Sequence, residues 1–219
     1  MSILIVGASH RTASVELLER LALDTDGASK LSTRALLTPH VTEALVLATC
    51  NRVEIYAEVD RFHGSVEDLT ALLVEKSDLP TERVLSALYV HYDEAAVAHL
   101  LSVATGLESM VVGESQILGQ VREALRRGQD DETVGPALNS LFQQGLRVGK
   151  RAHFETDIDR AGQSLVSVAL DEAAHTIGPI EGARVLIVGA GSIAGLAANS
   201  VRRAGRVADR DRVAHPGQR

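Results

Sequence analysis

Hydrophobic and polar residues follow different periods in the early and later parts of this chain. Over residues 1 to about 92, short apolar runs alternate with helical periods. Residues 52–59 alternate polar and apolar side chains over eight positions, which predicts a half-buried antiparallel strand. Strands are predicted at 3–8, 43–49, 53–59 and 88–92, and helices at 15–23, 28–37, 65–75, 94–104, 121–128, 136–154 and 164–176. Interleaving of this kind indicates a small α+β sandwich, followed from Asp93 onward by helices.

Residues 183–198 read as a strand, a glycine turn and the start of a helix. Gly189, Gly191 and Ala194 fit the G-x-G-x-x-A dinucleotide fingerprint, in which the glycines permit a tight turn and close approach of a pyrophosphate. A plain strand–turn–helix is the alternative. The fingerprint expects a second strand and a ribose-binding residue about 20 positions on. Only a minimal strand at 206–208, followed by Asp209 and Arg210, is available, so this fold is incomplete.

Composition is that of an ordinary globular protein, with 45% apolar and 23% charged residues among 219. One cysteine excludes an internal disulfide and a multi-cysteine zinc site, and we expect no metal. No signal peptide and no apolar run of about 18 residues is visible, which indicates a cytoplasmic protein outside the membrane. A net charge of −7 disfavours non-specific binding to nucleic acid, although residues 202–219 carry a local balance of +4.

Cys50 stands where the apolar run 44–48 gives way to polar residues. A strand that ends in a thiol flanked by Thr49, Asn51 and Arg52 could present a nucleophile at a cleft. Taken alone, a single cysteine is more often a small buried hydrophobe than a nucleophile. Similarly, a single histidine inside a predicted helix, such as His99, is ordinarily structural.

The segment 106–121 combines glycines with polar side chains and is too polar for a core. Its composition predicts a loop–helix junction that brings backbone and amide groups close to a ligand. A flexible loop would explain the glycines but not the clustered carboxamides. The turn at Ser9, His10 and Arg11 is either the lining of a polar pocket or a solvated loop.

Residues 49–56 (TCNRVEIY) and 108–120 (ESMVVGESQILGQ) together resemble the two signatures of glutamyl-tRNA reductases. The resemblance covers residues 1 to about 200. It implies an α+β catalytic domain over residues 1–155 and the start of an α/β Rossmann-type NADPH-binding domain, incomplete, over residues 156–219. The C-terminal dimerisation region of that family has no counterpart here.

The same resemblance implies a reaction. The Cys50 thiolate would attack the ester of glutamyl-tRNA to give a thioester, and hydride from NADPH would reduce it to glutamate-1-semialdehyde, the first step of tetrapyrrole (porphyrin) synthesis. Cysteine suits this task because its thiolate is both a good nucleophile and a good leaving group. His99 matches a family position implicated in activity. The expected partners are glutamyl-tRNA and the downstream aminomutase, and the family is homodimeric.

Two sets of binding residues follow from the resemblance, and Arg52 would use its planar guanidinium to grip a carboxylate. The glutamyl group would be held by Thr49, Cys50, Asn51, Arg52, Ser109, Glu114, Ser115, Gln116 and Gln120. The NADPH phosphates would be held by Gly189, Ala190, Gly191, Ser192, Ile193 and Ala194. Three functions stay open: a reductase, a fragment that only deacylates glutamyl-tRNA through Cys50, and a non-catalytic remnant that binds tRNA or a partner.

Overall fold

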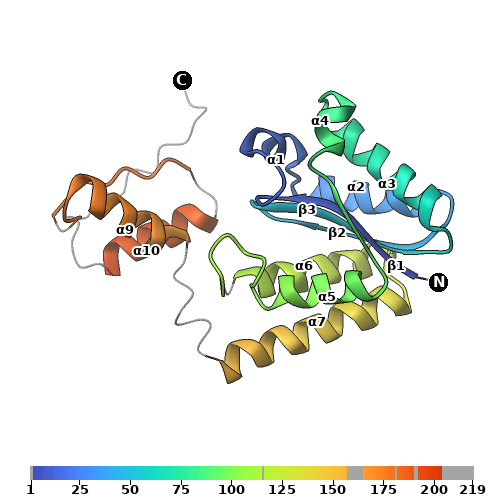
Figure 1. The fold of residues 1–219 in the computed structure, drawn as a ribbon. Helices are drawn as coiled ribbons and strands as arrows, with labels where there is room; N and C mark the ends of the chain where they lie inside the picture. The colour runs from blue at the N-terminus through green and yellow to red at the C-terminus, as the bar shows by residue number, and fades with distance from the viewer. Residues whose placement is uncertain (1, 115, 157–164, 181, 190–191, 204–219) are drawn as a thin grey trace. The chain divides into compact units, whose positions relative to one another are not determined.

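The protein is described by a computed structural model over residues 2–114, 116–156, 165–180, 182–189 and 192–203. The chain divides into two compact units, Met1–Ala161 and Gly162–Arg219. In the first unit the strands are β1 (Ser2–Ser9), β2 (Val41–Ala48), β3 (Arg52–Val59) and β4 (Tyr89–Tyr92). Its helices are α1 (Val15–Leu21), α2 (Thr25–Leu36), α3 (Phe62–Ser77), α4 (Thr81–Leu85), α5 (Glu94–Ala104), α6 (Gln116–Asp130) and α7 (Pro136–Glu155). The second unit contains α9 (Leu165–Ile177) and α10 (Ser192–Arg203) (Figure 1).

The strands of the first unit form one sheet in the order β2-β3-β1-β4, and all neighbours are antiparallel. The register of β1 and β3 pairs Ser2 with Val59 at one end and Ser9 with Arg52 at the other. The α+β prediction is therefore confirmed, and each predicted strand lies within two residues of the observed bounds. The register also places the start of β3, just after Cys50, beside the end of β1.

Helices cover both faces of this sheet, with α1 to α4 on one side and α5, α6 and α7 on the other (Figure 1). Successive residues of a strand point to opposite faces, and β3 follows this rule. Val53 and Ile55 join the core beneath α1 to α4, whereas Tyr56 joins the core against α5 to α7. The Tyr56 ring meets Phe142 of α7 edge to face, with centroids 4.9 Å apart. The first unit is thus a three-layer sandwich with two apolar cores.

The prediction that β3 is half-buried is wrong, because its polar face is buried as well. Arg52 and Glu54 are 2% and 0% exposed, although their alternation with apolar residues suggested a solvated face. The helices α5 to α7 cover that face, and the polar side chains are retained there because they bond to one another, as buried polar groups must. A buried polar strand face is the first structural sign of a functional site.

Local chemistry explains where several helices begin. Ser14 caps α1 as predicted, since its hydroxyl accepts a hydrogen bond from the Leu17 amide at 3.3 Å. The buried carboxylate of Glu43 in β2 accepts the amides of Ala137 (3.0 Å) and Leu138 (2.7 Å), which fixes the first turn of α7 against the sheet. The helix predicted at 121–128 begins earlier, at Gln116, and α4 was not predicted.

The strand predicted at 183–188 is wrong for this structure. Only Val188 makes a single bridge, and residues 183–187 have no regular structure. Leu186 is 73% exposed and Val188 70% exposed. A strand needs neighbours to pair its backbone and cover its faces, and the described residues of the second unit supply no sheet for it. The minimal strand proposed at 206–208 lies outside the described residues. Within the described ranges, no helix is long and apolar enough to cross a membrane.

Candidate active site at the end of the sheet

Cys50 lies at the tip of the connection between β2 and β3. The connection is closed by the Thr49 amide, which donates to the Arg52 carbonyl at 2.9 Å, and by the Asn51 amide, which donates to the Thr49 hydroxyl at 3.1 Å. The Asn51 carbonyl in turn accepts the His10 amide at 2.9 Å, which ties the tip to the end of β1. Cys50 is exposed, so the interpretation of a buried hydrophobe is wrong, and the fold presents the thiol on a fixed turn.

The thiol is not activated by the surrounding protein. Burial of the sulfur by neighbouring atoms, and then the charge of Glu114, raise the pKa of Cys50. A raised pKa keeps the thiol protonated at neutral pH. Attack by this sulfur therefore requires a group that accepts its proton.

Behind the tip, a buried ion pair joins the first residues of β3. Arg52 donates from Nη1 to Glu54 Oε1 at 2.8 Å and from Nη2 to the Glu108 carbonyl. Burial acts to lower the pKa of Arg52, but the carboxylate of Glu54 raises it, so the guanidinium stays charged. This side chain links the Cys50 connection to the 106–114 segment from within.

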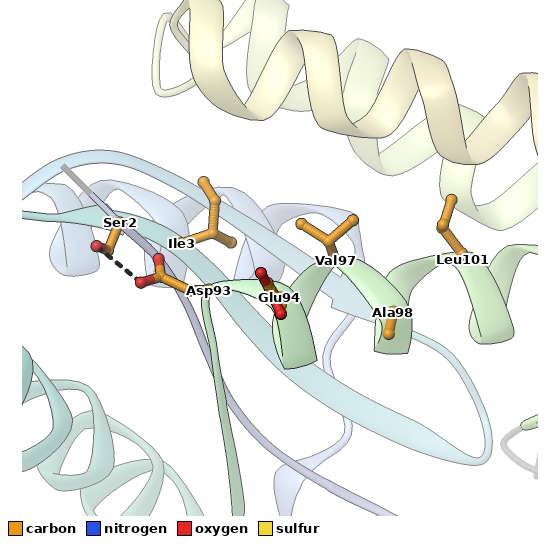
Figure 2. Close-up of a pocket in the computed structure, with 7 residues that line it drawn as sticks. All are labelled: Ser2, Ile3, Asp93, Glu94, Val97, Ala98 and Leu101. Atoms are coloured by element: carbon orange, nitrogen blue, oxygen red, sulfur yellow. Dashed lines mark hydrogen bonds between the residues drawn. The ribbon is translucent and has the colours of Figure 1, made fainter.

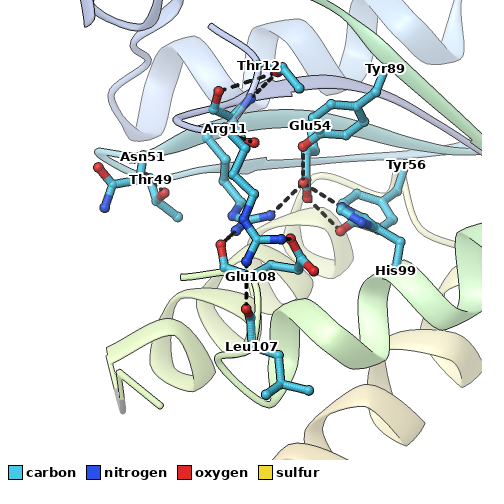
Figure 3. A network of polar contacts seen from close by, with 12 residues as sticks. Arg11, Thr12, Thr49, Asn51, Glu54, Tyr56, Tyr89, His99, Leu107 and Glu108 are labelled. Atoms are coloured by element: carbon cyan, nitrogen blue, oxygen red, sulfur yellow. Dashed lines mark hydrogen bonds and ion pairs between the residues drawn. The ribbon is translucent and has the colours of Figure 1, made fainter. Parts of the chain in front are cut away.

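Glu54 is the centre of a polar network on the α5 to α7 face of the sheet (Figure 3). Besides Arg52, its Oε1 accepts the Tyr89 hydroxyl at 2.5 Å and His99 Nε2 at 2.8 Å, while Oε2 accepts the Tyr56 hydroxyl at 2.6 Å. Burial acts to raise the pKa of Glu54, but the hydrogen bond from His99 and the charge of Arg52 outweigh it and hold the pKa at about 2. The carboxylate is therefore ionised throughout the neutral range.

The two tyrosines of the network are donors only. Burial and the neighbouring Glu54 carboxylate raise the pKa of Tyr56 and Tyr89 far above the usual range, so both hydroxyls keep their protons. His91 stacks on His99 with ring centroids 4.3 Å apart and planes inclined by 20°. Burial, and then the proximity of His99, lower the pKa of His91, which keeps the stacked ring neutral.

The 106–114 segment is a loop that leads into α6, as its composition predicted. Gly106 has φ +79°, and a Cβ on it would lie 3.1 Å from the Gly113 Cα, so the loop closes on itself through glycine. The Gly113 amide donates to the Gly106 carbonyl at 3.0 Å. Arg11 anchors the loop from outside by an ion pair to Glu108 at 2.6 Å and a hydrogen bond to the Leu107 carbonyl at 3.0 Å.

His10 lies next to the Cys50 connection, through its hydrogen bond to Asn51. Burial, and then the charges of Arg52 and Arg11, lower the pKa of His10, so its imidazole is neutral. Its Nδ1 is buried and, within the part of the chain that the structure describes, has no hydrogen-bond partner. The turn at residues 9–11 is therefore part of the site rather than a solvated loop.

The structure brings most of the predicted site residues of the first unit together. Thr49, Cys50, Asn51 and Arg52 form the connection, Ser109 is buried in the loop that Arg52 contacts, and the Glu114 charge reaches Cys50. His99 joins them through Glu54. Gln116 and Gln120 lie on the first turns of α6, and neither forms a hydrogen bond with the described residues of the Glu54 network. Ser115 lies outside the described residues.

The sequence interpretation missed Glu54, Tyr56, Tyr89 and His91. The available signal was Tyr89 and His91, which lie close in sequence to His99. It was not used because the alternation in β3 assigned Glu54 to solvent.

In the second unit, part of the predicted phosphate loop is described. Gly189 has φ +132°, which only glycine adopts readily, and α10 begins at Ser192. Ala194 is a partly buried residue of that helix, whereas Ala190 and Gly191, and the side chains of Ser192 and Ile193, lie outside what is described. A sharp turn before a helix N-terminus fits a phosphate group, although the strand that should precede it is not formed. Among the described residues, no group of three or more His, Cys, Asp or Glu could hold a metal.

A groove elsewhere on the first unit contains none of these residues. It measures about 390 Å³ and is lined by Ser2, Ile3, Asp93, Glu94, Val97, Ala98 and Leu101 (Figure 2). Ser2 pairs with Val59, seven residues along the strands from the pairing of Ser9 with Arg52. At roughly 3.4 Å per residue, the groove lies at the opposite end of the sheet from Cys50.

The fold and the site define a three-layer α+β domain that presents a thiol beside a buried carboxylate–histidine network. The chain belongs to the glutamyl-tRNA reductase family. The family described as "Glutamyl-tRNAGlu reductase, N-terminal domain" matches residues 6–156.

Two curated relatives and one solved structure illustrate the similarity. The chain is 62% identical over 201 residues to "Glutamyl-tRNA reductase 1" of Nocardioides sp., covering 92% of this chain and 47% of that protein. It is 52% identical over 208 residues to glutamyl-tRNA reductase of Streptomyces coelicolor, covering 94% and 36%. The structure of glutamyl-tRNA reductase from Methanopyrus kandleri superposes with a TM-score of 0.60 at 32% identity, covering 94% and 48%. The chain thus spans about half the length of the relatives that it matches, or less.

Proposed function

We propose that this chain acts on glutamyl-tRNA and that Cys50 captures the glutamyl group. In this step the sulfur bonds to the ester carbonyl carbon and the bond from that carbon to the ribose oxygen breaks. The thiol proton ends on the departing oxygen, so the products are a thioester on Cys50 and free tRNA. The observation that carries the proposal is the exposed thiol, fixed on a closed connection beside a buried acid–histidine network, in a chain of this family.

We propose that the glutamyl group is bound by the Cys50 connection and by the loop that leads into α6, which meet at Arg52. The binding side chains would be those of Thr49, Asn51, Arg52, Ser109, Glu114, Ser115, Gln116 and Gln120. Support comes from the contact between Arg52 and the Glu108 carbonyl, which holds the two segments together. Because Arg52 is already paired with Glu54, direct contact with a substrate carboxylate would have to use a guanidinium edge that these bonds leave free.

NADPH is proposed as the cofactor, held by residues 189–194. The positive φ of Gly189, which favours glycine, and the helix N-terminus at Ser192 support this assignment, because free amides at a helix N-terminus suit a phosphate group. When bound, NADPH would supply the hydride that reduces the thioester to glutamate-1-semialdehyde for tetrapyrrole synthesis. We also propose two protein partners: the aminomutase that would receive this aldehyde, and a second copy of the chain.

A second candidate function is discharge alone, in which water hydrolyses the Cys50 thioester to glutamate. It is favoured by one observation: the segment 183–188, where a dinucleotide-binding sheet would begin, forms no strand, and its Leu186 and Val188 side chains are exposed. Both candidates share the capture step and differ only in the fate of the thioester.

The test measures three quantities with charged tRNA and NADPH: loss of the ester, release of glutamate and formation of aldehyde. Aldehyde formation supports the reductase, and glutamate release without aldehyde supports discharge alone. If the Cys50→Ser variant discharges glutamyl-tRNA as fast as the wild type, the capture step is disproved and a non-catalytic role in binding tRNA becomes the better account.

A further inference from the structure

Three donors converge on a single oxygen of the buried Glu54 carboxylate. Arg52, Tyr89 and His99 all donate to Oε1, whereas Tyr56 alone donates to Oε2. These donors come from strand β3, strand β4 and helix α5, so the carboxylate connects three elements of the first unit. A buried carboxylate with this many partners is held in one position, and it holds its partners in turn.

A glycine in the central strand makes room for this arrangement. Gly7 of β1 is paired with Glu54 on one side and with Tyr89 on the other. Tyr89 therefore reaches across β1 to bond with Glu54. A Cβ at position 7 would lie 2.7 Å from the Val53 carbonyl oxygen and 2.8 Å from the Glu54 Cγ, both closer than real Cβ contacts. The absence of a side chain at Gly7 is thus a condition for the position of Glu54.

The network decides which nitrogen of His99 carries a hydrogen. An ionised carboxylate only accepts hydrogen bonds, so the ring nitrogen 2.8 Å from it, Nε2, must be the donor. In a neutral imidazole the lone pair then lies on Nδ1. Among the residues that the structure describes, none forms a hydrogen bond with Nδ1. The stacked ring of His91 restrains the same imidazole from one face.

We propose that Glu54 is a positioning residue for His99: it fixes the Nε2–H tautomer and leaves Nδ1 as the proton acceptor of the site. This inference rests on the proposed capture step. Among the described residues, Cys50 is linked to His99 through Arg52 and Glu54 rather than by direct contact, so a water or a substrate atom relays the thiol proton to Nδ1 as sulfur bonds to the ester carbon. The same proton then goes on to the departing ribose oxygen. The transient imidazolium keeps its Nε2–H on the Glu54 carboxylate, which stabilises the positive charge.

The first measurement is structural and needs no substrate. The ¹⁵N shifts of the His99 ring, assigned by comparison with a His99→Asn variant of the full chain, report which nitrogen is protonated. We expect the Nε2–H tautomer in the wild type and a mixture of tautomers in Glu54→Gln. A wild-type ring with its hydrogen on Nδ1 overturns the proposal, whatever the activity of the protein.

The second measurement is kinetic. Loss of positioning should lower kcat for discharge of glutamyl-tRNA by about 10- to 100-fold in Glu54→Gln and leave KM nearly unchanged. Glu54→Asp keeps the negative charge, but its shorter side chain moves the carboxylate oxygens away from His99. We expect the same loss of kcat in this variant. Full activity in Glu54→Asp would show that charge alone matters and would overturn the assignment of a positional role.

Glu43→Gln is the matched control, because it neutralises another buried carboxylate of the first unit, one that accepts the first amides of α7 and belongs to no part of the Glu54 network. We expect its kcat and its His99 tautomer to match the wild type. Should Glu54→Gln fail to fold, Gly7→Ala displaces Glu54 while keeping every polar group, and it should shift the tautomer and lower kcat in the same way. An unchanged tautomer and kcat in a folded Gly7→Ala variant contradict the proposal. Failure of the capture step is recognised separately, by a Cys50→Ser variant that remains active.

Discussion

The two compact units of this chain differ in whether their apolar, strand-like segments are buried. In the first unit, Ile5 and Leu45 are completely buried between the sheet and the helices α5 to α7. In the second unit, Leu186 and Val188 are 73% and 70% exposed. Both segments have an apolar pattern that predicts a strand. The difference lies in the neighbours: β1 and β2 pair with β3, whereas residues 183–187 pair with no described strand.

Polar groups show the same contrast. The first unit buries Glu54 with four donors around it, and this organised network lies behind the exposed Cys50. The described part of the second unit offers a glycine turn and a helix N-terminus as its only features of the predicted phosphate loop. The geometry of the first unit therefore supports the proposed capture of the substrate, whereas only a short local motif of the second unit supports the proposed binding of the cofactor.

The largest effect is expected for the chemistry of the first unit. Cys50→Ser should reduce discharge of glutamyl-tRNA by about a thousandfold or more, because a hydroxyl is a far weaker nucleophile than a thiolate. Cys50 is exposed, so thermal unfolding of the variant should match the wild type. The readout is ester loss from charged tRNA in a single turnover.

Gly189→Val is the control from the second unit. It puts a β-branched residue at φ +132° and should abolish any stabilisation by NADPH in a thermal-shift assay while leaving discharge intact. Loss of discharge in Gly189→Val would show that capture depends on the second unit, and the division of labour between the units would be wrong.

A large loss of stability is expected when the buried ion pair is broken. Arg52→Met leaves Glu54 without its cationic partner and should cost about 3–5 kcal/mol of unfolding free energy. Chemical denaturation measures this loss of unfolding free energy. Arg126→Met removes an exposed arginine that pairs with Glu123 and Asp130, and its denaturation midpoint should not move. Equal effects of the two variants would mean that the Arg52–Glu54 pair is solvated, contrary to its burial.

The stability of the first unit should fall in acid because of Glu54. Its pKa is about 2 in the folded chain, below the ordinary 4.5, so its contribution is complete above pH 4.5 and is lost as the pH falls from 4.5 towards 2. A shift of this size corresponds to about 3 kcal/mol. Unfolding free energies between pH 6 and pH 2.5 should therefore decline more steeply in the wild type than in Glu54→Gln. Parallel curves would refute the lowered pKa.

The smallest effect is expected at the exposed apolar run of the second unit. Leu186→Ser should leave the unfolding transition unchanged, since its side chain is already in water. The matched change in the first unit, Leu45→Ala, removes a fully buried side chain and should cost about 2–5 kcal/mol. A marked destabilisation by Leu186→Ser would reveal that residues 183–188 are covered in solution, and the contrast between the units would disappear.

The periodicity of the sequence predicted the secondary structure well wherever the described residues include a segment's neighbours. It predicted the four strands and the cap at Ser14, and it placed Cys50 at the end of a strand. It failed for Glu54, because alternation of polar and apolar residues distinguishes the two faces of a strand but not whether the polar face is covered. It also failed at 183–188, because an apolar pattern forms a strand only beside a paired neighbour, and no described strand pairs with residues 183–187.

The sequence by itself determined the family signatures, the strand order in the chain and the position of Cys50 as the single thiol. These are local properties, written in residue types and spacings. Only the tertiary structure decided that the polar face of β3 is buried, that Gly7 lies between Glu54 and Tyr89, and that Nε2 of His99 faces the carboxylate. Those facts depend on packing between segments up to 92 residues apart, from Gly7 to His99, and no short-range pattern encodes such contacts.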